Sequence, residues 1–122
     1  MPIAYSIDKS AGIIRETWTG QVSAADLAAH WMRLLTDSEA LTIRKTLVDL
    51  RGCSIDFSGE QLFELIREVA EPMLRGRDWR SALVVAKPLH YGVSRQYQSL
   101  AHVYSKDAIF HDSSAALDWL RQ

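Results

Sequence analysis

Residues 46–66, TLVDLRGCSIDFSGEQLFELI, decide the fold of this chain. The segment from Thr46 to Leu50 is almost entirely apolar, which indicates a strand buried on both faces of a sheet. A short loop follows and ends in Asp56-Phe57-Ser58-Gly59. Beyond it, apolar residues recur at the spacing of one helical face as far as about Arg75. Pro72 is expected either to bend this helix or to stop it near Glu71, with a restart before Gly76. A strand, a loop and an amphipathic helix in this order predict an α/β protein.

The rest of the chain continues the alternation of strands and helices. Alternating apolar residues predict a hairpin over residues 3–18, and a helical period predicts a helix over 23–35. Further strands are predicted at 81–86 and 108–110, each followed by a helix. Together these segments predict a single domain over residues 1–122, a mixed sheet of about five strands with about four helices in the order ββαβαβαβα.

Ser58 stands at the predicted start of the helix. With Gln61 three residues later it forms a capping-box pattern, in which the serine hydroxyl accepts a hydrogen bond from a free backbone N–H group. The same helix end carries partial positive charge, which would also stabilise a phosphate on this serine. The pattern therefore favours a helix cap, and a phosphoacceptor or partner-contact role stays open.

The order of elements and the motif Asp56-Phe57-Ser58-Gly59 resemble the STAS domain of anti-sigma-factor antagonists, which has the SpoIIAA-like fold. In that family the serine of the motif is phosphorylated by a partner kinase. The resemblance implies that Ser58 is the candidate phosphoacceptor, and that Asp56, Phe57, Gly59 and Phe63 form a contact surface for a protein partner. Because Phe57 replaces a hydroxyl residue of the antagonist motif, the chain looks like a divergent SpoIIAA-like protein of undefined function.

The function that the resemblance implies is a non-catalytic regulatory or protein-interaction module. The expected partner is a kinase or an anti-sigma-like regulator, and a homodimer is a further expectation. No catalytic residue and no cofactor are expected. Because the pattern around Ser58 is also explained by helix capping, a second class of function is kept beside this one.

The alternative function is a ligand site at the carboxyl ends of the parallel strands, where open α/β sheets usually bind ligands. Five residues are expected near these ends and could line a site for a small anion, lipid or metabolite: Lys87, His90, Tyr91, Arg95 and His111. A cryptic enzyme that uses Ser58 with a histidine and Asp56 belongs to the same alternative.

Composition argues against several classes of function. With 14 basic and 15 acidic residues the net charge is −1, so the chain as a whole does not attract nucleic acid. The sequence shows no signal-peptide pattern and no run of about 18 apolar residues, so we expect no integral membrane segment and a cytoplasmic location. The single cysteine, Cys53, excludes an internal disulfide, and the histidines lack a metal-binding spacing, so no metal is expected.

The same patterns predict the burial of several side chains. His30 borders the apolar face of the first helix and is expected to be half covered. Trp18 ends a strand and Trp79 lies among arginines, so one or both are expected to be partly exposed. Cys53 is expected just beyond the strand as a small buried side chain. For Phe63, core packing and a partner contact are equally favoured.

Overall fold

The computed structural model describes residues 2–122 and contains a five-stranded mixed sheet in the order β1-β2-β3-β4-β5. The strands are β1 (Ile3–Asp8), β2 (Ile13–Ser23), β3 (Lys45–Asp56), β4 (Trp79–Val84) and β5 (Ser105–Phe110). Strands β1 and β2 form the predicted antiparallel hairpin, and every later pair is parallel. The predicted α/β fold class is confirmed.

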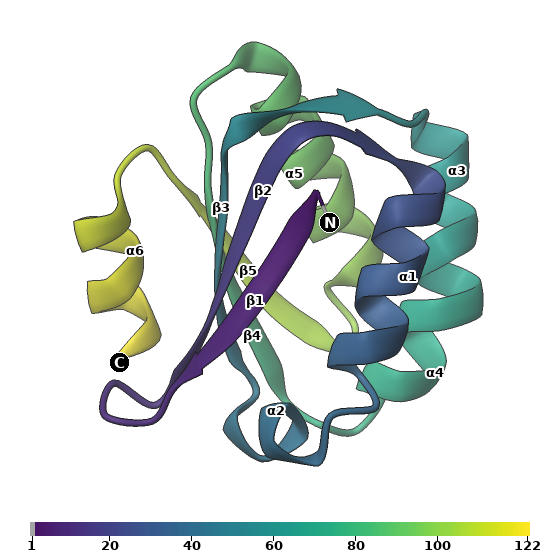
Figure 1. Cartoon of the computed structure of the whole chain (residues 1–122). Helices are drawn as coiled ribbons and strands as arrows, with labels where there is room; N and C mark the ends of the chain where they lie inside the picture. The colour runs from purple at the N-terminus through teal and green to yellow at the C-terminus, as the bar shows by residue number, and fades with distance from the viewer. Residues whose placement is uncertain (1) are drawn as a thin grey trace.

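The helices lie in two unequal layers (Figure 1). They are α1 (Ala24–Leu34), α2 (Ser38–Ile43), α3 (Gly59–Leu65), the π-helical segment η1 (Ile66–Ala70), α4 (Glu71–Leu74), α5 (Pro88–Ala101) and α6 (Ser113–Leu120). Helix α1 packs on β1 and β2, and α5 packs on β3 and β5, while α3 contacts both of these helices. Helix α6 lies alone on the opposite face of the sheet.

The second predicted helix is continuous through three differently wound segments. Segment η1 has the wider π-helical winding, and α4 begins directly after it with Pro72 in its first turn. Pro72 has no N–H and cannot make the hydrogen bond that a continuous helix would form at this position, and the wider turn lies directly before it. The wider turn therefore absorbs the bend that Pro72 was expected to cause, and the helix does not stop and restart.

Strand β3 is longer than the sequence predicted. Residues 51–55, expected as a loop, continue the strand and pair with β2, where Gly52 lies opposite Thr19 and Ile55 opposite Val22. Strand β4 pairs only with Lys45–Asp49, so the second half of β3 forms a two-stranded ribbon with β2. Cys53 is thus buried within the strand and not beyond its end. The second half of β3 was predicted as a loop because several of its residues are polar and face the solvent.

The core lies on both faces of the sheet. A small cluster that includes Ala82, Val84 and Leu120 holds α6 against one face. Larger clusters, which contain Trp18 and Trp79, fill the space between the sheet and the helices of the other face. Both tryptophans are buried, so the prediction that one or both are partly exposed was wrong.

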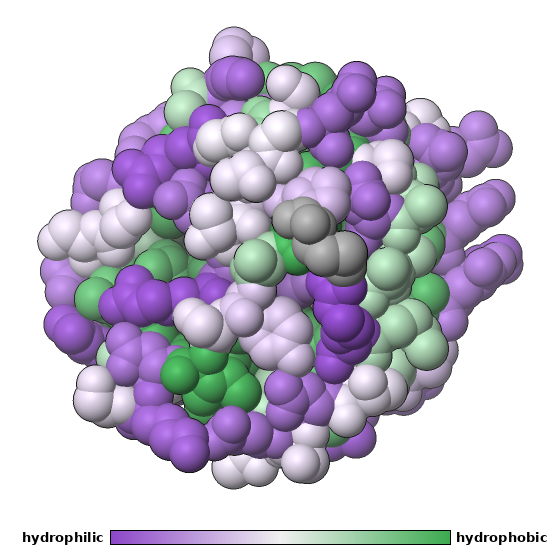
Figure 2. Space-filling view, in the orientation of Figure 1, coloured by the Kyte–Doolittle hydropathy of each residue, from purple (hydrophilic) through white to green (hydrophobic). Residues whose placement is uncertain are grey.

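One face of the molecule is mainly hydrophilic. On the face shown in Figure 2, hydrophilic residues predominate and hydrophobic residues appear in small separate areas. No helix within residues 2–122 is both long enough and apolar enough to cross a membrane.

Candidate functional site

The start of α3 is built as the predicted helix cap. The Ser58 hydroxyl accepts a hydrogen bond from the Gln61 backbone N–H at 3.1 Å, and the Gln61 side-chain oxygen accepts one from the Ser58 N–H at 2.9 Å. These two bonds satisfy two backbone donors that the helix leaves free. The geometry alone explains why a serine stands here, although the Ser58 side chain remains exposed to solvent.

The neighbours of Ser58 have different environments. Asp56 is exposed and Phe63 is 47% exposed, whereas Phe57 is half-buried and turns toward the core. Gly59 lies where α5 comes close: its carbonyl accepts a hydrogen bond from Gln96 Nε2 at 3.1 Å, and a Cβ at this position would lie 2.5 Å from the same nitrogen. The predicted contact surface is therefore only partly continuous.

Replacing Ser58 tests the capping role. We expect Ser58→Ala to lower the free energy of unfolding by about 1 kcal/mol, because the Gln61 N–H loses its acceptor. Ser58→Asp should stay within about 0.5 kcal/mol of wild type, since aspartate caps helices as well as serine does. Urea denaturation measures both values, with Ser114→Ala at an exposed position of α6 as the control. A Ser58→Ala protein as stable as the control would contradict the capping role.

His90 is a structural residue of the α5 start and not an open ligand-binding group. Its ring is 1% exposed, and Nδ1 accepts a hydrogen bond from the Lys87 backbone N–H at 3.2 Å. Its other nitrogen, Nε2, lies 2.9 Å from the Cys53 carbonyl oxygen and donates to it. Because backbone groups occupy both nitrogens, the ring has no free nitrogen for a ligand or for the hydroxyl proton of Ser58.

The other residues of the predicted strand-end site have different surroundings from His90. Lys87 Nζ donates to the Cys53 carbonyl at 3.4 Å, while Arg95 donates to the Gln98 side chain on its own helix at 3.4 Å. Tyr91 and His111 are exposed on the surface. None of these five residues lines the interior cavity described below.

Cys53 is not an activated thiol. Burial raises its pKa to about 11, and the nearby Lys87 charge only partly opposes this. The sulfur lies 3.9 Å from His90 Nε2, but that nitrogen is engaged with the Cys53 carbonyl. The thiol therefore stays protonated at neutral pH and is a poor nucleophile.

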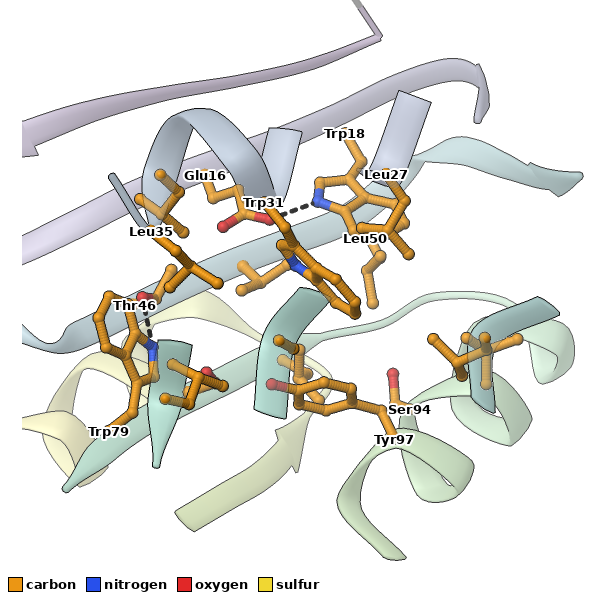
Figure 3. Close-up of a pocket in the computed structure, with 18 of the residues that line it drawn as sticks. Glu16, Trp18, Leu27, Trp31, Leu35, Thr46, Leu50, Trp79, Ser94 and Tyr97 are labelled. Atoms are coloured by element: carbon orange, nitrogen blue, oxygen red, sulfur yellow. Dashed lines mark hydrogen bonds between the residues drawn. The ribbon is translucent and has the colours of Figure 1, made fainter. Parts of the chain in front are cut away.

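The sequence did not predict an apolar cavity that lies between the sheet and the helices α1, α3 and α5. The volume of the cavity is about 70 Å³. At ~10–15 Å³ for each water molecule, this is room for about five waters. Aromatic and aliphatic side chains form most of its wall (Figure 3). The aromatic ones are Trp18, Trp31, Phe57, Trp79 and Tyr97. The wall of this cavity is therefore apolar apart from a few polar groups.

Glu16 is the acidic polar group of this cavity. Its side chain is 4% exposed, and Oε1 accepts a hydrogen bond from the Trp18 indole at 2.8 Å. The same oxygen lies 2.9 Å from Nε2 of His30, a close contact without the alignment of a hydrogen bond. His30 is fully buried, so the prediction of a half-covered boundary residue was wrong. A buried carboxyl group held between an indole and an imidazole is a costly arrangement that packing alone does not require.

The wall also includes four residues with hydroxyl groups, Thr46, Ser81, Ser94 and Tyr97. Thr46 accepts a hydrogen bond from the Trp79 indole at 3.1 Å. Ser94 is 2% exposed, and its hydroxyl has no hydrogen-bond partner anywhere in residues 2–122. Burial raises the pKa of Tyr97 well above its usual value, so its hydroxyl stays protonated. Figure 3 shows Ser94 and Tyr97 extending from α5 toward the space beside Trp31.

One sequence signal could have pointed to this site. In the alternating pattern of β2, the inward positions are Ile14, Glu16 and Trp18. An acidic residue at an inward position of a buried strand is unusual unless it is paired or functional. The cavity itself had no such signal, because it depends on how three helices pack over the sheet. Within residues 2–122, no three or more His, Cys, Asp or Glu side chains come together as a metal site.

Comparison with known proteins supports the fold. No protein-family model matches the chain, and no curated protein matches it. A crystal structure of an uncharacterised DUF3478-family protein from Shewanella loihica PV-4, which has a SpoIIAA-like fold, superimposes with a TM-score of 0.62 at 21% sequence identity. The match covers 97% of this chain and 93% of the other. The element order, the mixed sheet and this similarity together show that the chain has a SpoIIAA-like fold.

Proposed function

We propose that this protein is a non-catalytic module that binds a small, largely apolar molecule in the interior cavity. The observation that carries the proposal is the cavity wall, which is apolar and rich in aromatic side chains but includes the buried polar groups Glu16 and Ser94. Ligand sites in proteins have this composition: an apolar concave wall with a few polar groups that fix orientation. A cavity that only filled a packing defect would not need a carboxyl group or an unpaired hydroxyl.

Binding without catalysis is supported by the state of the reactive side chains. The Cys53 thiol has a raised pKa, and both ring nitrogens of His90 are held by backbone groups. Ser58, which the sequence analysis considered as a nucleophile, is exposed outside the cavity and serves as a helix cap. These residues therefore do not provide a nucleophile with a free base beside it, as covalent catalysis needs.

The size of the cavity limits the ligand. Room for about five waters corresponds to a single ring or a short branched chain, and not to a long acyl chain. Three tryptophans, Trp18, Trp31 and Trp79, line the space, so occupancy should change the intrinsic fluorescence. This gives a direct signal for a binding screen.

A screen of single-ring compounds by tryptophan fluorescence and thermal unfolding tests the proposal. We expect at least one compound to bind, and at one hundred times its Kd to stabilise the protein by about 2.7 kcal/mol. Val93 lies on α5 at the half-buried part of the wall. We expect Val93→Phe, which fills the space, to weaken binding at least tenfold. Val103→Phe at a position that is 79% exposed is the matched control. A screen without any binding compound, or binding unaffected by Val93→Phe, would overturn the proposal.

A second candidate function is a regulatory contact at the start of α3. It is favoured by the exposed Ser58 and by Phe63, a large apolar side chain that is 47% exposed only five residues away. Exposed aromatic side chains are frequent in protein interfaces. In this role the surface of Asp56, Phe57, Ser58, Gly59 and Phe63 would meet a kinase, an anti-sigma-like regulator or a second copy of the chain.

The regulatory candidate has its own test. Ser58→Asp imitates the charge of a phosphoserine while keeping the helix cap. A partner that binds wild type and Ser58→Ala but not Ser58→Asp would support the candidate, as would phosphorylation of Ser58 by a cognate kinase. Equal binding to all three proteins, with no phosphate on Ser58, would count against it.

A further inference from the structure

We infer, resting on the binding function proposed above, that the cavity selects a neutral ring compound that carries a hydroxyl group, and that it rejects carboxylates. The inference depends on the unpaired hydroxyl of Ser94, on the charge of the wall, and on the aromatic side chains that surround the space. Each of these observations limits a different part of the ligand.

Ser94 indicates the polar group of the ligand. Its hydroxyl is buried at 2% exposure, lines the cavity and has no hydrogen-bond partner in the described chain. Buried polar groups are nearly always paired, so an unpaired one beside an open space points to an absent partner. A serine hydroxyl can donate and accept at once, and a ligand hydroxyl matches both capacities.

The position of Ser94 places this polar group beside the aromatic ring of Tyr97. Ser94 and Tyr97 are three residues apart on α5, so they share one face of the helix, and both line the cavity. Figure 3 shows both side chains on the α5 side of the space, with Trp31 across from them. The ring of Tyr97 lies 6.0 Å from that of Trp31, centroid to centroid. A ligand hydroxyl at Ser94 therefore leaves its ring among aromatic side chains.

The wall offers no cationic partner to an anionic ligand. Among the described residues that line the cavity, none is Lys, Arg or His, while Glu16 contributes a carboxyl group. A carboxylate that enters such a space loses its hydration without gaining a cationic partner, which is strongly unfavourable. A neutral hydroxyl avoids this penalty. The same wall thus accepts an alcohol or phenol and rejects the corresponding acid.

Phenol, toluene and benzoate form a matched set of probes. Toluene replaces the hydroxyl of phenol by a methyl group of similar size, and benzoate carries the charge. For wild type we expect binding of phenol and toluene, and no detectable binding of benzoate. In Ser94→Ala the affinity for phenol relative to toluene should fall about tenfold, which corresponds to about 1.4 kcal/mol, the size of one hydrogen bond. Fluorescence titration measures these affinities.

The control and the stability of the variant keep the test decisive. Ser99→Ala, at an exposed position of the same helix, should leave the phenol-to-toluene ratio unchanged. The Ser94→Ala protein should unfold at the same temperature as wild type or higher, because it loses an unpaired buried hydroxyl. A failure to fold would itself contradict the claim that this hydroxyl is unpaired.

The outcomes separate the two proposals. If phenol and toluene bind but Ser94→Ala leaves their ratio unchanged, the hydroxyl inference fails and the binding function stands. Benzoate binding more tightly than phenol would also overturn the inferred ligand class and leave the binding function standing. If no single-ring compound binds, the binding function fails and the inference fails with it.

Discussion

Replacing Glu16 by alanine is expected to lower the free energy of unfolding by about 3–5 kcal/mol, the size typical for breaking a buried polar pair. The substitution removes the side-chain oxygen that accepts the hydrogen bond of the Trp18 indole N–H and that lies beside His30. Trp18 and His30 are both buried and would lose this partner. It also enlarges a cavity that is already open, so that the lining side chains lose contacts. A loss of this size is a large part of the stability of a domain of this length.

Two comparisons separate the polar contribution of Glu16 from the loss of volume. Glu16→Gln keeps an oxygen acceptor for Trp18, so we expect less than half of the loss seen with alanine. Glu64→Ala on the exposed face of α3 should change stability by less than about 0.5 kcal/mol. Urea denaturation at pH 7 measures all three variants. An alanine variant within 1 kcal/mol of wild type would show that the buried carboxyl group is not held by its partners.

The parts of the fold that sequence analysis predicted correctly are those fixed by local patterns. The period of the apolar residues gave α1, α5 and the strands, and the Ser58–Gln61 spacing predicted the cap that the structure contains. Two elements were missed for physical reasons. Helix α2 has only six residues, and its start depends on the Asp37 cap. The second half of β3 is exposed on one side, so its polar residues concealed the strand.

The candidate site was harder to predict because it is produced by packing. The cavity lies where α3 contacts α1 and α5 above the sheet. No local sequence pattern specifies how far these helices stand from the sheet. Of the predicted strand-end residues, His90 is held by backbone groups at the start of α5. The order of strands and helices predicted which strand ends are neighbours. It did not predict which side chains form hydrogen bonds with the backbone and so are not free to bind a ligand.

Asp107 is expected to make the stability of the protein depend on pH near neutrality. Its carboxyl group is buried on β5, where Oδ1 accepts a hydrogen bond from the Ser105 hydroxyl at 2.8 Å and Oδ2 has no partner within residues 2–122. Burial raises the pKa of Asp107 to about 7, although hydrogen bonds from Ser105 and Ser81 partly oppose the increase. In the unfolded chain the pKa is about 3.9. The folded state therefore binds the proton more tightly than the unfolded state does.

The sign of the effect follows from this difference. Between pH 4 and pH 7 the unfolded state has released the Asp107 proton and the folded state retains it, so stability falls as the pH rises through this range. A difference of about three pKa units corresponds to a loss of at most about 4 kcal/mol. Above pH 7 both states are ionised and the loss is complete. Asp107→Asn keeps the shape of the side chain without the charge, so it removes this dependence.

Comparison of the two proteins across pH isolates the contribution of Asp107. We expect Asp107→Asn to match wild type near pH 4 and to be more stable by about 2–4 kcal/mol at pH 8. The pKa of Asp49 is lowered by its hydrogen bond to Arg51, so its stabilising effect is lost only as the pH falls further. It acts equally in both proteins and cancels in the difference. Urea denaturation at pH 4, 6 and 8 measures this difference. If the free energies of unfolding of the two proteins changed equally with pH, the buried carboxyl group would ionise as it does in water. Water would then reach this end of the sheet beneath α5.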